Sequence, residues 1–291
     1  MSVGDYAHAA IKKSVNHILR QEKGVLAHGD PEYLHQIRVG LRRLRSVCQT
    51  FDSVVALPVC DRDLKRIGKI LGQTRDLDVL QIWLKTFEQQ TKLKKSETKA
   101  LHRLNRTLEK QRQRCVHQTD KLLTGRSYKR LFKAIKKWIK RPDYQPVASL
   151  PLAIALPDLQ LPGISQLLLH PGWLVVDYTE TTQFPQVHAL RKRIKEIRYQ
   201  MSLFKEFYGE DYRSQVNSFR QMQDVLGELQ DEVVLQDFLT KTLGKKWSKQ
   251  LPSLKHYFCQ HHKQLWQRWL TLRQPYLSAA QRNSLHRLFL T

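Results

Sequence analysis

Apolar residues recur every three or four positions along most of the chain, a spacing that places them on one face of an α-helix. In the segment 35–51, HQIRVGLRRLRSVCQTF, the residues Ile37, Leu41, Leu44 and Phe51 fall on one side. At about 100° per residue, the basic residues of the segment fall on the opposite side. The pattern predicts a helix with an apolar back for a core and a cationic front.

The same spacing predicts helices before and after this segment. Asp30 and Pro31 form an N-cap and first-turn pair, while Gly72 predicts a break after which Asp76 caps a new helix. No segment shows the alternation of a β-strand, so the predicted class is all-α. The expected helices cover residues 6–27, 31–57, 61–71, a stretch from 77, 96–123, 126–141, 185–208, 211–226, 228–243, 252–273 and a stretch after 275.

The cationic front recurs in the second half of the chain. The segment 188–204, HALRKRIKEIRYQMSLF, repeats the pattern of 35–51, and LGQTRDLDVLQIWL from Leu71 aligns with LGELQDEVVLQDFL from Leu226. An internal duplication is the simplest interpretation. The paired positions of the two fronts are His35 with His188, Arg38 with Arg191, Arg42 with Lys195, and Arg45 with Arg198.

Between the two copies lies a proline-rich stretch, 142–185, with short apolar runs and no helical period. It predicts a connection that packs against the helices, with one short helical turn near 164–169. The expected organisation is therefore a first helical bundle at 1–141, the connection at 142–185 and a second bundle at 186–291.

The charge balance is strongly basic, with 50 lysines and arginines against 26 acidic residues and a formal net charge of +24. Self-repulsion of this size destabilises a compact state unless an anion offsets it. A polyanionic partner is the natural inference.

The expected location is the cytoplasm of the cell. No apolar run of a signal peptide or a membrane span is present in the sequence, and no cysteine pair has the C-x-x-C spacing. The cysteines are expected to be reduced thiols: Cys48, Cys60, Cys115 and Cys259.

A His-x-x-Arg-x-x-x-[Arg/Lys]-x-x-Arg helix in two copies, each followed by Leu-Gly-x-x-x-Asp, resembles the CHAD family of histidine-containing α-helical domains. The resemblance covers nearly the whole chain, 1–291, as a single domain. It implies two pseudo-symmetric antiparallel four-helix bundles flanking a basic central cavity. It also implies that the protein binds inorganic polyphosphate without a cofactor, with polyphosphate granules as an expected place of association.

Rows of arginine and lysine suit such a ligand, because a linear polyphosphate carries close to one negative charge per repeat and has no bases. Arginine adds a planar fork that can take two oxygens of one phosphate. Lysines and arginines of neighbouring helices are second-rank candidates. The predicted polyphosphate-binding residues are His35, Arg38, Arg42, Arg43, Arg45, Lys65, Lys69, Lys129, Arg130, Lys133, His188, Arg191, Lys192, Lys195 and Arg198.

Two other functions compete with polyphosphate binding. The net charge alone would allow non-specific binding of nucleic acid, although the aromatic residues mostly fall at core positions. A metal-dependent polyphosphate hydrolase would use Asp76, Asp78 and Asp231 and ranks last. Catalysis has little support because the sequence lacks a Walker-type glycine loop, an H-E-x-x-H motif and the E-x-E-x-K pattern of triphosphate tunnel enzymes.

Two further patterns have ordinary explanations. His256, Cys259, His261 and His262 lie close together but lack a second ligand cluster for zinc, so exposed helix positions are the better interpretation. The segment 126–141 is a basic amphipathic helix that could lie on a membrane, but its apolar side fits equally well as the wall of a bundle.

Overall fold

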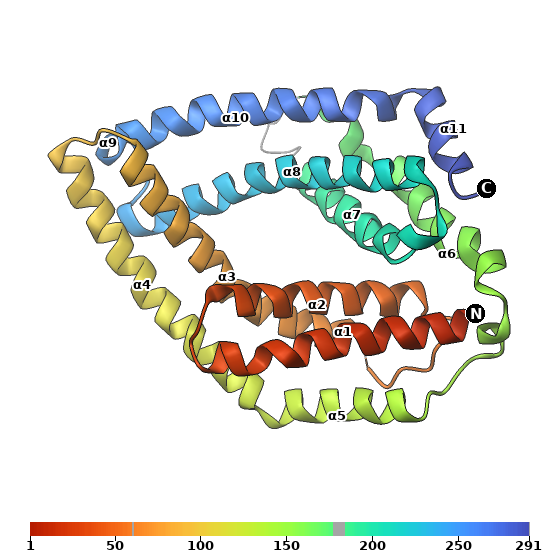
Figure 1. Ribbon diagram of the computed structural model, residues 1–291. Helices are drawn as coiled ribbons and strands as arrows, with labels where there is room; N and C mark the ends of the chain where they lie inside the picture. Colours follow the sequence, from red (N-terminus) through yellow and green to blue (C-terminus); the bar gives the residue numbers. More distant parts are fainter. Residues whose placement is uncertain (60, 177–183, 291) are drawn as a thin grey trace. The chain divides into compact units, whose positions relative to one another are not determined.

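The computed structural model describes residues 1–59, 61–176 and 184–290. The chain divides into two compact units, Met1–Leu152 and Ala153–Thr291. The described residues form helices and two isolated β-bridges but no strand, which confirms the all-α prediction (Figure 1). A four-helix bundle in each half and a basic cavity shared by them stay predictions.

The described residues of the first unit form five α-helices and a short 3-10 helix. Ser2 and Asp5 form a capping box at the start of the first helix, and Asp30 caps the second by accepting a hydrogen bond from the amide of Glu32 at 2.7 Å. The elements are α1 (Val3–Leu26), α2 (Pro31–Thr50), α3 (Asp61–Gln90), α4 (Lys95–Thr124), α5 (Arg126–Lys140) and η1 (Pro146–Ser149).

The core of the first unit lies where the apolar spacing places it. Ile37, Leu41, Leu44 and Phe51 are almost fully buried. Helix α2 packs along α1 on one side and against α3 on another. A Cβ built at Gly40 would overlap the side chain of Ile18, so this glycine permits the close approach of α1 and α2.

The predicted break at Gly72 is wrong, because α3 runs unbroken from Asp61 to Gln90. A glycine inside a helix costs only about 1 kcal/mol relative to alanine. Leu64, Ile67 and Leu84 supply buried contacts on both sides of it, and these outweigh that cost. Asp76 is consequently a mid-helix residue and caps nothing.

The second unit repeats this departure at Gly227, which lies inside one long helix where two were expected. Predictions for the last two helices, 252–273 and after 275, are confirmed. The elements are α6 (Leu152–Leu168), η2 (Pro171–Leu174), α7 (Phe184–Leu203), η3 (Lys205–Phe207), α8 (Glu210–Leu243), α9 (Trp247–Gln250), α10 (Pro252–Arg273), η4 (Gln274–Leu277) and α11 (Ala279–Arg287).

Helix α6 corrects the prediction that 142–185 contains only a short helical turn. It includes Pro157 and Pro162, which remove backbone donors and ordinarily break a helix. Tertiary contacts compensate: Gln160 is buried and binds the hydroxyl groups of Tyr208 and Tyr212. Residues 177–183 of this stretch lie outside the described residues.

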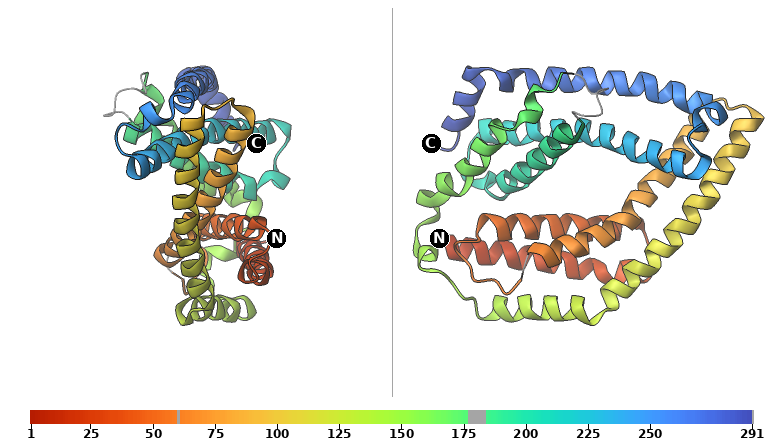
Figure 2. Two further views of the ribbon diagram at one scale, coloured as in Figure 1. Left: turned by 90° about the vertical axis from the view of Figure 1, so that its left-hand side faces the viewer. Right: turned by 180° about the vertical axis from the view of Figure 1, so that it is seen from behind.

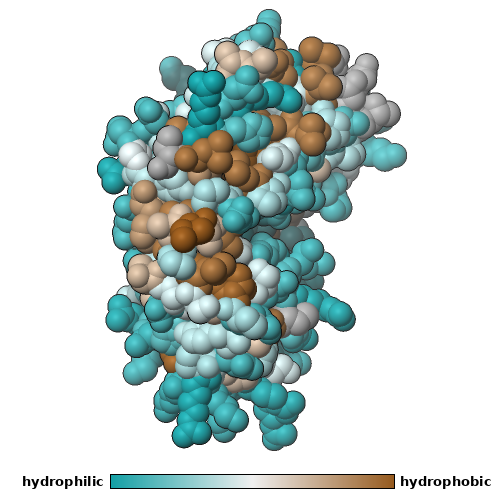
Figure 3. Space-filling model, turned by 90° about the vertical axis from the view of Figure 1, so that its right-hand side faces the viewer, coloured by the Kyte–Doolittle hydropathy of each residue, from teal (hydrophilic) through white to brown (hydrophobic). Residues whose placement is uncertain are grey.

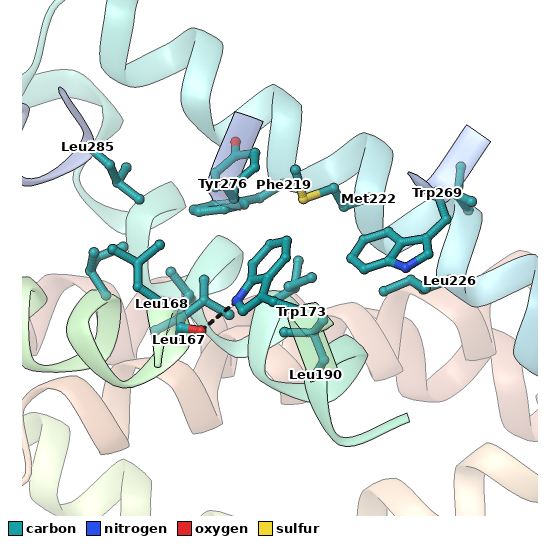
Figure 4. Close-up of a cluster of buried hydrophobic side chains, with 14 of the residues drawn as sticks. Leu167, Leu168, Trp173, Leu190, Phe219, Met222, Leu226, Trp269, Tyr276 and Leu285 are labelled. Atoms are coloured by element: carbon teal, nitrogen blue, oxygen red, sulfur yellow. Dashed lines mark hydrogen bonds between the residues drawn. The ribbon is translucent and has the colours of Figure 1, made fainter. Parts of the chain in front are cut away.

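Trp173 and Val175 of the same stretch are buried in the core of the second unit, in agreement with the prediction that the connection packs against the helices. Trp173 is 1% exposed and stacks on Trp269 and Tyr276 at centroid distances of 5.7 and 5.2 Å (Figure 4). Its indole nitrogen donates to the carbonyl of Leu167 at 2.7 Å. Buried Arg273 donates to the carbonyls of Trp173 and Val175, which fixes the C-terminal end of η2.

Helices α3 and α4 form an antiparallel pair in the first unit, and α5 leaves the end of α4 at an angle and runs beside α1 (Figure 2). The apolar side of α5 is buried through Tyr128, Phe132, Ile135 and Trp138. Figure 3 shows hydrophilic side chains at the lower end of the view, the end that α5 forms in Figure 1. Because its apolar side is already used, α5 has only its cationic side to offer a partner.

The described cysteines are free thiols. Burial raises the pKa of the Cys48 thiol to about 12, so this thiol is unreactive. Cys115 and Cys259 are free, and Cys60 lies outside the described residues. Among the helices of the described residues, none combines the length and the apolarity needed to cross a bilayer.

Candidate anion-binding site

The cationic front of α2 meets α3 and forms a cluster with it. His35, Arg38 and Arg42 are partly buried on this side of α2, whereas Arg43 is exposed. Burial lowers the pKa of His35 from its ordinary value of 6.5; nearby Glu32 opposes this, and Arg75 of α3, Arg42 and Arg38 lower it further. One histidine and three guanidinium groups therefore share one face, which we call the first motif face: His35, Arg38, Arg42 and Arg75.

Arg38 is held against α3 by the absence of a side chain at Gly72. A Cβ at Gly72 would overlap the Nη1 atom of Arg38. That nitrogen donates to the carbonyl of Gly68 at 3.3 Å, and Nη2 lies 3.6 Å from a carboxylate oxygen of Asp76. With only 13% of its side chain exposed, Arg38 occupies a fixed position.

The other two arginines of this face carry unbalanced charge. Within the described residues, neither Arg42 nor Arg75 has an ion pair or a hydrogen bond from its side chain. Their charges repel one another, and an anion on the face would relieve that repulsion.

Arg45 has a structural partner. Its Nε and Nη2 atoms donate to the two carboxylate oxygens of Asp61 at 2.8 and 3.1 Å, a bidentate pair that joins the end of α2 to the start of α3. Its role in phosphate binding stays a prediction. A phosphate would have to compete with Asp61 for the two donors of Arg45.

The second motif face, on α7 and α8, comprises His188, Arg191, Lys195 and Gln230. Burial lowers the pKa of His188, Lys192 and Arg191 lower it further, and a hydrogen bond with Gln230 opposes them. Arg191 lies beside Gly227, but a Cβ there would be 3.8 Å from its Nη2, an ordinary contact distance. Arg191 therefore packs less closely on Gly227 than Arg38 does on Gly72.

Arg198, at the end of the second motif helix, is paired differently from Arg45. Its Nε donates to Gln223 at 2.9 Å, and its guanidinium carbon lies 4.2 Å from the centre of the Tyr199 ring. Because both partners are neutral, they do not balance the positive charge of Arg198.

The second-rank candidates divide between two places. Lys65 and Lys69 are exposed on α3, the helix that carries the first motif face. Lys129, Arg130 and Lys133 are exposed on α5, on the side turned away from α1 and α4, so the structure does not group them with the first motif face. Arg130 instead lines a cavity of about 330 Å³, and the other residues lining it include Asp63, Arg66, Leu122 and Tyr128.

The carboxylates considered for a metal have protein partners. Buried Asp78 accepts a hydrogen bond from Arg112 Nε at 2.7 Å, and Asp76 faces Arg38. Asp231 is exposed. No group of three or more histidine, cysteine or acidic residues in the described parts of the chain could hold a metal ion.

The interpretation of His261 and His262 as exposed positions is wrong. Their Nδ1 atoms lie 2.6 and 3.0 Å from the two carboxylate oxygens of Glu232, which is only 6% exposed. His256 and Cys259 are exposed as expected. The two histidines therefore connect α10 to α8.

Arg75 is the residue of the first motif face that was absent from the predicted set. The signal was present in the sequence, because an unbroken helix from Asp61 places positions 68, 72, 75 and 76 close together around its axis. The predicted break at Gly72 placed Arg75 outside the helix, so its position beside the motif residues was missed.

Comparison with known proteins identifies a family and several solved structures of similar fold. The model of the CHAD domain family matches residues 9–240. The crystal structure of the CHAD domain from the plant Ricinus communis has a TM-score of 0.63 and 23% identity, covering 100% of this chain and 92% of that one. PptA from Streptomyces chartreusis has a TM-score of 0.61 and 15% identity, covering 90% of this chain and 100% of its own. At these identities the structures show a shared fold. No curated protein sequence matches the chain.

Proposed function

Because the chain belongs to the CHAD domain family, we propose that it binds inorganic polyphosphate and does not hydrolyse it. The observation that carries the proposal is the first motif face, where Arg42 and Arg75 lie beside Arg38 and His35 and have no ion-pair partner in the described part of the chain. Such a face is destabilised by its own charge and is stabilised by a bound anion.

The chemistry of the face suits a chain of phosphates. The segment from His35 to Arg42 spans about 10 Å along α2, a length over which a linear polyphosphate places several charges. Arginine keeps its charge at every physiological pH and donates through a planar fork. Arg38, fixed against Gly72, would orient one phosphate, while Arg42 and Arg75 supply further donors on the same face.

Binding without hydrolysis is the consistent form of this proposal. Phosphoryl transfer usually needs metal ions held by carboxylates. Asp78 is buried in an ion pair with Arg112, and Asp76 faces Arg38, so neither carboxylate is set up to hold a metal against a phosphate. Association with polyphosphate granules in the cytoplasm would follow from such binding.

Equilibrium titration with long-chain polyphosphate, with duplex DNA as competitor at equal charge concentration, tests the function. We expect tight binding that weakens steeply with salt, because the polyanion releases condensed counterions, and little displacement by DNA. Displacement by DNA at equal charge would favour a nucleic-acid binder and overturn the proposal.

A separate assay tests the absence of catalysis. The protein is incubated with polyphosphate and Mg²⁺ or Mn²⁺, and released orthophosphate is measured. We expect no release above the protein-free rate. Release that disappears in Asp76→Asn would show that the protein is a hydrolase.

A further inference from the structure

A second cationic surface lies on α4, separate from the motif residues. Lys99, Arg103, Arg106 and Lys110 are exposed there, on the side of the helix opposite its buried leucines. Together with neighbouring side chains they form a groove of about 650 Å³, which we call the α4 groove. It is lined by Lys99, His102, Arg103, Arg106, Thr107 and Lys110.

The acidic residues of α4 are directed elsewhere. Glu97 is 1% exposed and accepts a hydrogen bond from the backbone amide of Lys94. Glu109 accepts hydrogen bonds from Gln81 and Gln113, and Asp120 lies 3.5 Å from His28. No acidic side chain lines the groove.

The cations of the groove are arranged at a cost to the helix. Arg106 and Lys110 are four residues apart, a spacing at which like charges destabilise an α-helix. Within the described residues neither has an ion-pair partner, and the same holds for Lys99. An anion in the groove would offset this repulsion, so the arrangement is suited to a negatively charged ligand.

The shape and lining of the groove restrict that ligand. From Lys99 to Lys110 it extends about 16 Å along one helix, which suits a linear chain. Its lining contains no aromatic side chain, whereas proteins that bind single-stranded nucleic acid generally stack bases on aromatic rings. A phosphate chain without bases is the ligand that fits.

We propose that the α4 groove is a second polyphosphate-binding site. It binds a different segment of the polyphosphate molecule from the one bound by the motif faces. This inference rests on the proposed function and extends it from one kind of site to two. Two sites on one protein would raise the affinity for long chains above that for short ones, because the second contact is made within the same complex.

The test compares two double variants that remove the same charge. Arg106→Gln with Lys110→Gln alters the groove, and Lys136→Gln with Lys137→Gln alters exposed positions of α5 as a control for net charge. Wild-type protein is titrated first with long-chain polyphosphate across a salt series. Absence of binding at that step contradicts the proposed function, not the groove in particular.

Given wild-type binding, the groove variant should bind about five- to tenfold more weakly. The slope of log affinity against log salt should fall by roughly one to two, because each lost contact leaves a counterion unreleased. The control variant should keep the wild-type slope, and circular dichroism should show unchanged helicity in both.

Three results would overturn the inference. An unchanged slope in the groove variant would show that the groove makes no contact. Equal losses in both variants would show a pooled electrostatic field in place of a site. If oligothymidylate binding falls as much as polyphosphate binding in the groove variant, the groove is a general polyanion surface.

Discussion

The two motif faces share a framework and differ in what their charges do. On α2 and α3, Arg38 lies tightly on Gly72, and the side chains of Arg42 and Arg75 form no ion pair or hydrogen bond with any residue that the structure describes. On α7 and α8 the position of Arg75 is taken by Gln230, which hydrogen-bonds His188. In the second face the histidine is therefore engaged by a neutral side chain of the protein. In the first face the corresponding position is a cation that remains available for a ligand.

A repeated sequence pattern fixes where side chains lie but not what they bind. Both histidines have a lowered pKa mainly through burial, and both glycines lie next to the motif arginine. The functional difference lies in single polar substitutions. We therefore expect the first motif face to contribute more to polyphosphate binding than the second.

The largest expected effect comes from neutralising two cations on one face. Arg42→Gln with Arg75→Gln should weaken polyphosphate binding roughly 30- to 150-fold, since each lost charge-assisted contact contributes about 1–1.5 kcal/mol. Titration at one fixed salt concentration measures it, and the helical signal should persist because neither residue is in the core.

Lys192→Gln with Lys195→Gln removes the same charge from the other motif helix and serves as the matched variant. Its loss should be about tenfold or less. Equal losses would mean that the two faces act as one field, and a larger loss in this variant would show that the second face is the stronger one.

Much of this framework could be predicted from the sequence, because helical periodicity reports directly on burial. The apolar back of α2 and the N-cap at Asp30 are as expected. Glycine and proline were the sources of error: Gly72, Gly227, Pro157 and Pro162 all lie inside helices. Their local penalties of about 1–3 kcal/mol are overcome by tertiary packing that no local pattern reveals.

The partners of individual charges could not be predicted from the sequence. Periodicity places Arg38, Arg42 and Arg45 on one side of a helix, but it does not show that Arg45 meets Asp61. That pair depends on how the start of α3 returns along α2. For the same reason, the contacts of His261 and His262 with Glu232 could not be predicted from the sequence.

The two glycines that lie beside the motif arginines, Gly72 and Gly227, should respond differently to substitution by alanine. Gly227→Ala should stabilise the protein by roughly 0.5–1 kcal/mol through helix propensity, since its Cβ meets Arg191 at an ordinary distance. Gly72→Ala should lack most of this gain, because the new Cβ displaces the guanidinium of Arg38 from Gly68 and Asp76.

Binding should separate the two glycine variants in the opposite sense. Gly72→Ala should weaken polyphosphate binding about three- to tenfold, while Gly227→Ala leaves it near the wild-type value. Thermal unfolding and titration at fixed salt measure the two quantities. If both variants gain stability and keep full affinity, Arg38 is not held in place by Gly72.

The smallest expected effect is on pH dependence and arises from the histidines. Burial lowers the pKa of His35 and of His188 below 6.5, so both are largely neutral at pH 7 in the free protein. A bound polyanion favours the protonated form. Binding should therefore take up protons, and affinity should rise about threefold between pH 7.5 and 5.5.

The stability of the free protein should change in the opposite direction. A histidine whose pKa is lowered by folding binds more protons in the unfolded state, so the stability associated with its neutral form is present above pH 6.5 and is lost as the pH falls below it. Acidification should lower the melting temperature without ligand and strengthen binding with it. His35→Gln should reduce the rise in affinity at low pH more than His188→Gln does. The cations Arg42 and Arg75 would bring phosphate close to His35, whereas His188 is already hydrogen-bonded to Gln230. Equal pH dependence in both variants and the wild type would show that neither histidine contacts the anion.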